Sequence, residues 1–203
     1  MILDLDQLPA RERHQLLIGT VVPRPIAFVS TIGAGGHNVA PFSYFALIAT
    51  TPPLLGVSIG LRRGAPKDTL RNVRETGDFV VNVVDEAMIR QVVQASGEWP
   101  YGEDEFAIAG LTPVGSERVR SPRVAESPVS YECTVERIVD FDATSLVVGR
   151  IVRAHVRDDL FHDGRVDPAR LRPVSRLGAE DYAPVREVFA LARPRVDARG
   201  PGS

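Results

Sequence analysis

Short apolar runs rich in Val, Ile, Phe and Thr recur along the chain, and Gly, Pro, Asn or Asp bounds each of them. Runs of this length and composition predict β-strands. The predicted strands cover residues 25–32, part of 39–49, 54–59, 79–84, 129–141 and 145–156. Residues 140–144, DFDAT, predict the turn of a long hairpin between the last two strands. Residues 32–38, IGAGGHN, predict a flexible turn.

Helical spacing is confined to three segments. Helices are predicted over residues 9–17, ending near Gly19, over 67–77 and over 85–96. In the second helix Pro66 precedes the first turn, Leu70 and Val73 lie three positions apart, and Gly77 is a C-terminal stop. Because many strands and few helices follow one another without regular alternation, the sequence favours a mainly β fold with helical decorations, a barrel or a sandwich.

The length of 203 residues fits one domain, predicted over 1–190, followed by a flexible tail over 191–203. Residues 97–123 are polar and rich in Pro and Gly, which predicts a surface excursion, although the sequence DEFAIAGL within it is able to pack back onto the body. The sequence therefore predicts a single body with one long polar connection.

Charge and hydropathy narrow the class of protein. The net charge of −2 offers no basic face for a nucleic acid. No run reaches the ~18 apolar residues of a membrane helix. The first residues carry acids where a signal peptide carries basic residues. A cytoplasmic protein that binds neither nucleic acid nor membrane is therefore expected.

Two residue types are used sparingly. Cys133 is the only cysteine and lies on a predicted strand, so we expect a small buried hydrophobe and neither a disulfide nor a cysteine-only metal site. Lys67 is the only lysine, since 23 of the 24 basic residues are Arg. It is either a leftover of an Arg-rich composition or a position that needs a compact ammonium, for which phosphate is a usual partner.

Two short motifs match the sequence patterns of known sites, but the secondary structure predicted around them does not match. The glycines of GAGG at 33–36 are followed by strand material rather than by a helix, so they do not form a dinucleotide loop. GVSIG at 56–60 has the pattern of a nucleophile elbow, but Val57 and Ile59 alternate with Ser58 as in a strand. A serine hydrolase using Ser58 is a remote alternative.

The histidines and acids give no catalytic or metal constellation. The four histidines, His14, His37, His155 and His162, have no metal-ligand spacing, and no pair of acids is placed as a general acid and base. His155 shares the alternation of residues 147, 149 and 151, and a satisfied core or rim histidine is favoured over a ligand. No catalytic side chain and no metal site are predicted.

One cluster carries candidate chemistry. Residues 38–45, NVAPFSYF, combine rings with polar groups, and the helix start at Lys67–Thr69 presents unpaired N–H groups, a cation and a hydroxyl just after Arg62 and Arg63. Such an end binds anions, although an ordinary N-cap beside a solvated lysine gives the same pattern. The two segments together indicate a nucleotide-like cofactor.

The chain resembles the flavin reductase-like family, whose fold is the FMN-binding split β-barrel, an antiparallel barrel of Greek-key type. The matching pieces run in order from about residue 12 to about 190. They are PRPIAFVST, NVAPFSYF, PPLLGVSIG, KDTLRNVRETGDFVVNVV, DEFAIAGLT, ESPVSYECTVERIV, VVGRIV and RLGAEDY. The resemblance implies a homodimer with FMN near the subunit interface.

By resemblance, the FMN-binding residues lie in the ring-rich segment, on the two strands beside it and at the helix start. They are Thr31, Asn38, Val39, Ala40, Pro41, Ser43, Tyr44, Phe45, Ser58, Arg63, Lys67, Asp68 and Thr69. Arg176 and Tyr182 of RLGAEDY are weaker candidates, because Ala179 stands where many relatives have a second glycine.

The resemblance also implies an activity. It is that of an FMN-dependent oxidoreductase of the NAD(P)H:flavin reductase type, which passes hydride from a nicotinamide to flavin and on to an acceptor or a partner oxygenase. An FMN-binding electron-transfer protein without its own NAD(P)H site is the alternative. The chemistry is that of the cofactor, which agrees with the absence of a predicted acid–base pair.

Overall fold

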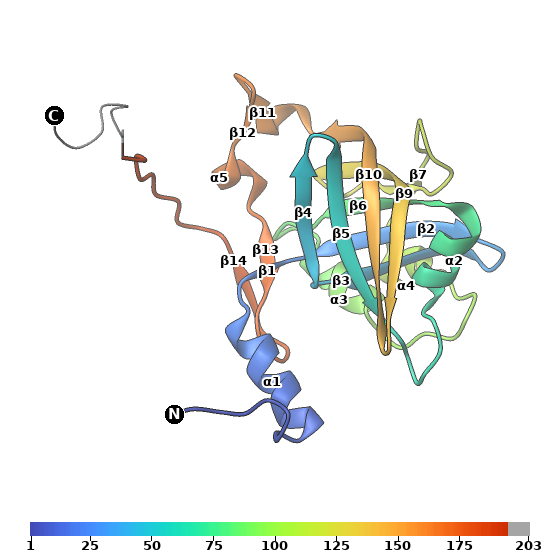
Figure 1. Cartoon of the computed structure of the whole chain (residues 1–203). Coiled ribbons are helices and arrows are strands. Elements are labelled where there is room, and N and C mark those ends of the chain that lie inside the picture. The colour runs from blue at the N-terminus through green and yellow to red at the C-terminus, as the bar shows by residue number, and fades with distance from the viewer. Residues whose placement is uncertain (195–203) are drawn as a thin grey trace, which may run out of the picture.

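The computed structural model describes residues 1–194, and its centre is a seven-stranded antiparallel sheet (Figure 1). In the order in which they pair, the strands are β3 (Gly36–Phe42), β2 (Ala27–Gly33), β6 (Asp78–Val83), β9 (Val129–Phe141), β10 (Thr144–Val156), β5 (Pro53–Gly60) and β4 (Phe45–Thr50). The predicted strands are all present, and the mainly β fold with helical decorations is confirmed.

The connection between β3 and β4 forces the sheet to curl. These strands form its two edges, yet only Ser43 and Tyr44 separate Phe42 from Phe45. An extended connection of this length spans at most about 11 Å. In a flat sheet of seven strands the edges lie roughly 29 Å apart. The sheet therefore closes on itself at Ser43 and Tyr44, which we call the seam, and the Ser58 N–H donates to the Tyr44 carbonyl there at 2.8 Å.

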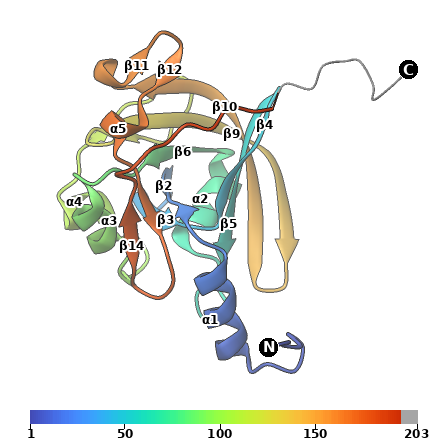
Figure 2. The ribbon, with the colours of Figure 1, turned by 90° about the vertical axis from the view of Figure 1, so that its left-hand side faces the viewer.

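Five helices and several short strands surround the barrel (Figure 2). The helices are α1 (Ala10–Thr20), α2 (Asp68–Thr76), α3 (Ile89–Ala95), α4 (Glu105–Ala109) and α5 (Pro168–Leu171), with a 3₁₀ turn η1 (Asp158–Leu160). The short strands are β1 (Arg24–Pro25), β7 (Pro113–Val114), β8 (Arg123–Val124), β11 (Phe161–His162), β12 (Arg165–Val166), β13 (Val174–Arg176) and β14 (Tyr182–Pro184). Both views place α1 beside the β13–β14 hairpin, so the two ends of the chain build one side of the molecule.

Two predicted boundaries are wrong for local reasons. The helix predicted over 85–96 begins only at Ile89, because the Asp85 carboxylate accepts from the N–H groups of Ala87 and Met88 and holds a turn there. The turn predicted over 32–38 contracts to 33–36, so that Asn38 lies in β3 opposite Thr31. The second change matters for the site, because it places the Asn38 side chain on a strand.

Other local predictions are confirmed. Helix α2 begins after Lys67 and ends at Gly77, which adopts the left-handed conformation with φ of 72°. Residues Phe141 and Thr144 pair across the turn of the long β9–β10 hairpin. Cys133 is completely buried in the barrel core, where burial raises the pKa of its thiol far above the ordinary value. It is therefore a small buried hydrophobe, as predicted.

The remaining sequence-based expectations concern the chain ends and special sites. Residues 191–194 of the predicted tail are exposed and have no regular structure, and residues 195–203 lie outside the described residues. Among residues 1–194, no helix is long and apolar enough to cross a membrane. Within the same range, no group of three or more His, Cys, Asp and Glu could hold a metal ion.

Candidate functional site

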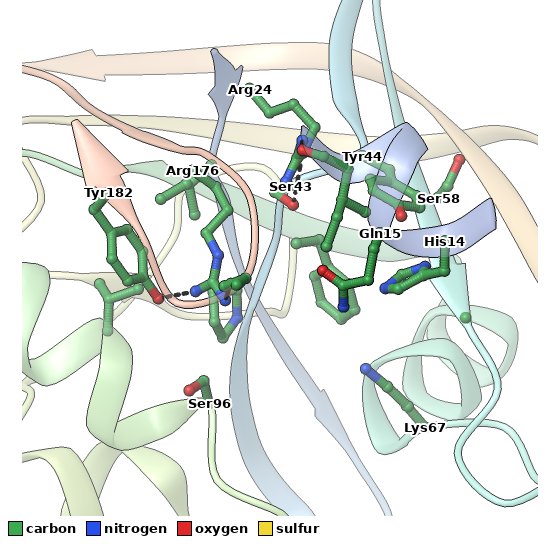
Figure 3. A pocket seen from close by; sticks show the side chains of 17 residues that line it. His14, Gln15, Arg24, Ser43, Tyr44, Ser58, Lys67, Ser96, Arg176 and Tyr182 are labelled. Carbon is green, nitrogen blue, oxygen red and sulfur yellow. Dashed lines mark hydrogen bonds between the residues drawn. The ribbon is translucent and has the colours of Figure 1, made fainter. Parts of the chain in front are cut away.

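A cavity of about 560 Å³ opens beside the seam (Figure 3). Helix α1 and the β13–β14 hairpin form one side of it, and β3, β5 and Lys67 form the other. We call it the larger cavity. Its walls carry the rings of Phe42, Tyr44 and Tyr182 together with several hydroxyl groups. None of the residues that line it is an Asp or a Glu, so its charged groups are cations alone.

A second cavity of about 360 Å³ adjoins the first. Its lining comes from β3, the loop before α2, the first turn of α2, residues 95–98 and α4. It includes three cations, Arg62, Arg63 and Lys67, and three acids, Asp68, Glu98 and Glu105. We call it the smaller cavity. The two cavities share Pro41, Lys67 and Ser96, so a bound molecule could pass from one into the other beside the lysine.

Lys67 stands at the junction of the two cavities. It precedes the first turn of α2, where no side chain caps the free N–H groups. Its Nζ lies 5.4 Å from the centre of the Phe42 ring. None of the ion pairs within residues 1–194 includes it. Burial, followed by the charge of Arg62, lowers the pKa of Lys67, so an anion placed here would be stabilised.

Asn38 is held by a buried polar network. Its Nδ2 donates to both carboxylate oxygens of Glu105 at 3.0 Å, and the Val39 N–H donates to the same carboxylate at 3.2 Å. Its Oδ1 accepts from the hydroxyls of Thr31, at 3.2 Å, and Thr69, at 2.8 Å. The network joins β2, β3, α2 and α4, and therefore fixes the helix start against the strand.

Glu105 is the acid of this network and is only 6% exposed. Burial raises the pKa of its carboxyl group, even though hydrogen bonds from its own N–H, from Val39 and from Asn38 oppose the rise. Both oxygens accept from Asn38, and Glu105 itself also lines the smaller cavity.

Most of the predicted cofactor-binding residues come together. Ten of the thirteen line one or both cavities: Asn38, Ala40, Pro41, Ser43, Tyr44, Ser58, Arg63, Lys67, Asp68 and Thr69. Thr31 and Val39 are fully buried behind them. Phe45 lines a neighbouring apolar groove of about 550 Å³ together with Leu17, Val21 and Ile48.

Two predicted groups are partly engaged within the protein. The Thr69 hydroxyl donates to Asn38, so the side chain points into the network rather than into open space. The Arg63 guanidinium is 85% exposed and pairs with Glu98 at 2.9 Å. At this helix start, Lys67 is thus the cation nearest the junction.

Sequence reasoning missed several lining residues. Arg24 lies within the motif PRPIAFVST but did not stand out among 23 arginines. His14 and Gln15 come from α1, and Ser96 follows α3. The weaker candidates Arg176 and Tyr182 do line the larger cavity, where the Arg176 guanidinium donates to the Tyr182 hydroxyl.

The two remaining motifs have structural explanations. Ser58 lies within β5, opposite Leu146, and not at a strand-to-helix turn, so the geometry of a nucleophile elbow is absent at this residue. His155 lines a different cavity, and its Nε2 lies 2.6 Å from the buried Glu132 carboxylate. It is a partnered rim histidine, as the sequence favoured.

Comparisons with known proteins agree on one family. The family model described as "Flavin reductase like domain" matches residues 16–170. An uncharacterized protein of Halalkalibacterium halodurans is 46% identical over 204 residues, which cover 97% of this chain and 98% of that protein.

Solved structures give the same result. Nitrilotriacetate monooxygenase component B from Bacillus cereus superimposes with a TM-score of 0.90 at 37% identity, covering 94% of this chain and 98% of the other. The 2-nitrobenzoate 2-nitroreductase NbaA of Pseudomonas fluorescens superimposes with a TM-score of 0.88 at 30% identity, covering 96% of each chain. These likenesses confirm the predicted antiparallel split barrel.

Proposed function

The chain belongs to the flavin reductase-like family, and on that premise we propose that it is an FMN-dependent oxidoreductase of the NAD(P)H:flavin reductase type. The observation that carries the proposal is the position of Lys67, a cation without an ion pair within residues 1–194, at the junction of the ring-lined larger cavity and the N-terminus of α2. A flavin mononucleotide has a flat ring system at one end and a phosphate at the other, which suits a ring-lined cavity that meets a helix N-terminus and an ammonium group.

The residues present fit such a group. A phosphate in the smaller cavity would meet the free N–H groups of α2 and the ammonium of Lys67, which are charge-assisted donors. The flat ring system would lie in the larger cavity, against β3 and the seam, where Pro41 and Ser43 provide backbone and hydroxyl groups. Asn38 would orient its own segment of β3, since the Glu105 network fixes it.

FMN bound here would supply the exchange of electrons between a nicotinamide and an acceptor. The protein would bind and orient the cofactor, and the cavity walls would keep water from one side of it. No Asp or Glu lines the larger cavity, which supports a role for the chain in binding rather than in acid–base chemistry.

The apolar groove supports a homodimer. Leu17, Val21, Tyr44 and Ile48 are large apolar side chains exposed along it, and contiguous exposed apolar surface marks an interface. The groove also shares Ser43, Tyr44 and Ser58 with the larger cavity. A second copy of the chain bound in the groove would therefore cover the side of the flavin site.

The names of structurally similar proteins suggest the kind of electron acceptor. One of them is a component of a monooxygenase by its name, which supports delivery of reduced flavin to a partner oxygenase. If the chain instead lacks a nicotinamide site, it is an electron-transfer flavoprotein, and the two possibilities differ in steady-state oxidation of NADH and NADPH. We expect oxidation of at least one nicotinamide when FMN is present. FMN binding without any oxidation would favour the electron-transfer alternative.

Binding of FMN and riboflavin to variants at Lys67 tests the cofactor site. We expect Lys67→Ala to weaken FMN about 10- to 100-fold, the range for one charge-assisted hydrogen bond, and to leave riboflavin nearly unchanged. Flavin fluorescence quenching measures both affinities. Arg74→Ala is the matched control, because Arg74 lies on the same helix but pairs with Asp140 away from both cavities. An equal loss for FMN and riboflavin would show that Lys67 does not contact the phosphate.

A further inference from the structure

Arg24 is a buried guanidinium held by main-chain carbonyls. It is 7% exposed and lies in β1, between α1 and β13. Nη1 donates to the carbonyls of Ile18 and Val21 at 2.6 Å, and Nη2 donates to that of Leu177 at 2.6 Å. Nε donates to the Ser43 hydroxyl at 3.4 Å. The side chain therefore ties α1, the C-terminal hairpin and the seam together.

The charge of Arg24 has no acidic partner. None of the ion pairs within residues 1–194 includes it. Its partner across the strand pair is another arginine, Arg176, and like charges placed opposite each other repel. A buried charge is usually paired, because removal from water is costly. The carbonyls satisfy the N–H groups but leave a net positive charge beside the cavity.

The position of Arg24 distinguishes it from the cations at the helix start. It lines the larger cavity and not the smaller one, whereas Arg62 and Arg63 line the smaller cavity and not the larger one. Its Cζ lies 5.8 Å from the centre of the Tyr44 ring at the seam. Figure 3 shows it beside Ser43 and Tyr44, on the far side of the cavity from Lys67. A charge here acts on what fills the ring-lined end.

We infer that Arg24 tunes the redox balance of the bound flavin, by supplying a buried positive charge that favours the negatively charged reduced ring over the neutral oxidised ring. The inference rests on the proposed function. Charge near the ring nitrogens is a lever by which a protein sets the potential of a flavin. Arg24 thus has two roles, since the same guanidinium also joins three elements of the cavity wall.

Neutral and charged replacements of Arg24 separate the charge from the scaffold. Arg24→Gln removes the charge but keeps an amide that is able to donate to the main-chain carbonyls, whereas Arg24→Lys keeps the charge. The affinities for oxidised and reduced FMN are measured anaerobically, together with the midpoint potential of the bound flavin. We expect Arg24→Gln to lower the preference for reduced flavin about tenfold relative to Arg24→Lys, a fall of about 30 mV for a two-electron couple.

Comparison with the wild type gives a second result. Arg24→Met also removes the charge and should lower the same preference about tenfold, whereas Arg24→Lys should change it less than threefold. Both variants should melt at a lower temperature than the wild type, because the carbonyls of Ile18, Val21 and Leu177 lose donors. A purely structural role predicts instead that the redox preference follows the melting temperature in both variants.

The outcomes are distinguishable. Equal potentials for Arg24→Gln and Arg24→Lys, or an equal loss of oxidised and reduced FMN binding in the charge-removing variants, would overturn the role of Arg24. If Arg24→Met does not fold, the comparison of Arg24→Gln with Arg24→Lys decides. Failure of the wild-type chain to bind FMN in either form would instead refute the proposed function.

Discussion

Buried charges are treated differently in two regions of the molecule. Around Glu132 and Asp78, which hold the loop over residues 115–121, each acid has several donors: Glu132 accepts from the N–H groups of Glu117 and Arg118, and Asp78 accepts from Ser121. Around the larger cavity, Lys67 and Arg24 have no acidic partner within the described residues. The buried acids that hold the loop have donors within the described residues, whereas the two cations at the cavity have no acidic partner there, including Arg24, which also holds three elements together.

Removal of Glu132 should give the largest effect on stability. Glu132→Ala leaves the N–H groups of Glu117 and Arg118 and the ring of His155 without their acceptor, so we expect a loss of about 3–5 kcal/mol in the free energy of unfolding. Chemical denaturation measures the loss. Glu136, like Glu132, lies in β9, and Glu136→Ala breaks only an exposed ion pair with Arg150 of β10, so this control variant should cost far less. Equal losses would mean that the buried hydrogen bonds of Glu132 contribute no more to stability than the exposed ion pair of Glu136.

Removal of Asn38 should have the next largest effect. Asn38→Ala leaves the buried Glu105 carboxylate without its amide donor and the Thr31 and Thr69 hydroxyls without their acceptor. We expect a loss of about 2 kcal/mol in the free energy of unfolding, together with weaker FMN binding. Thr69→Val removes a single hydroxyl and should cost less than half as much. If FMN binding survives Asn38→Ala unchanged, the network does not position the site.

The pH dependence of stability should have opposite signs at the two buried glutamates. Burial alone would raise the pKa of Glu132, but donors from Glu117, His155 and Arg118 lower it below its ordinary value near 4.5. The wild type should therefore be more stable than Glu132→Gln above pH 4.5, and this difference in the free energy of unfolding should be lost as pH falls through the folded-state pKa of Glu132.

At Glu105, burial raises the folded-state pKa, so the unfolded chain releases its proton first. The stability of the wild type relative to Glu105→Gln should therefore fall as pH rises from about 4.5 through the folded-state pKa. Denaturation midpoints between pH 3 and pH 8 in both variants measure the two slopes. Slopes of the same sign would contradict the opposite pKa shifts of the two glutamates.

Lys67→Met should have the smallest effect on stability, and in the opposite direction. The lysine is a partly buried cation without an acidic partner, so its removal should leave the ligand-free protein unchanged or stabilise it by up to about 1 kcal/mol. Thermal melting without and with FMN measures this, and the increase in melting temperature caused by FMN should shrink in the variant. Destabilisation of the ligand-free protein would show that Lys67 is part of the scaffold.

The sequence was sufficient for features that depend on neighbours in the chain. Alternating apolar residues predicted β9 and β10, and Pro66 and Gly77 fixed the limits of α2. The start of α3 was misplaced because Asp85 caps a turn with its side chain, which a helical pattern does not reveal. Secondary structure could therefore be predicted where main-chain groups make the local hydrogen bonds, and not where a side chain replaces one of them.

Contacts between residues far apart in the sequence could not be predicted in this way. Glu105 lies 67 positions from Asn38, and although the sequence DEFAIAGL that contains it was expected to be able to pack back onto the body, nothing in that sequence identifies Asn38 as its partner. Arg24 lies 153 positions from Leu177, and the Arg-rich composition conceals it. The resemblance located residues that line the two cavities, but the residues that hold them in place required the three-dimensional structure.

The close approach of Gly178 to Gly19 joins two segments that are synthesised at different times. A Cβ at Gly178 would lie 3.4 Å from the Cα of Gly19, so the C-terminal hairpin packs against the end of α1 with no side chain between them. During synthesis the first of these segments leaves the ribosome long before the second. A nascent chain that has already formed its barrel therefore still lacks one wall of the larger cavity, and that wall is added only in the last part of translation.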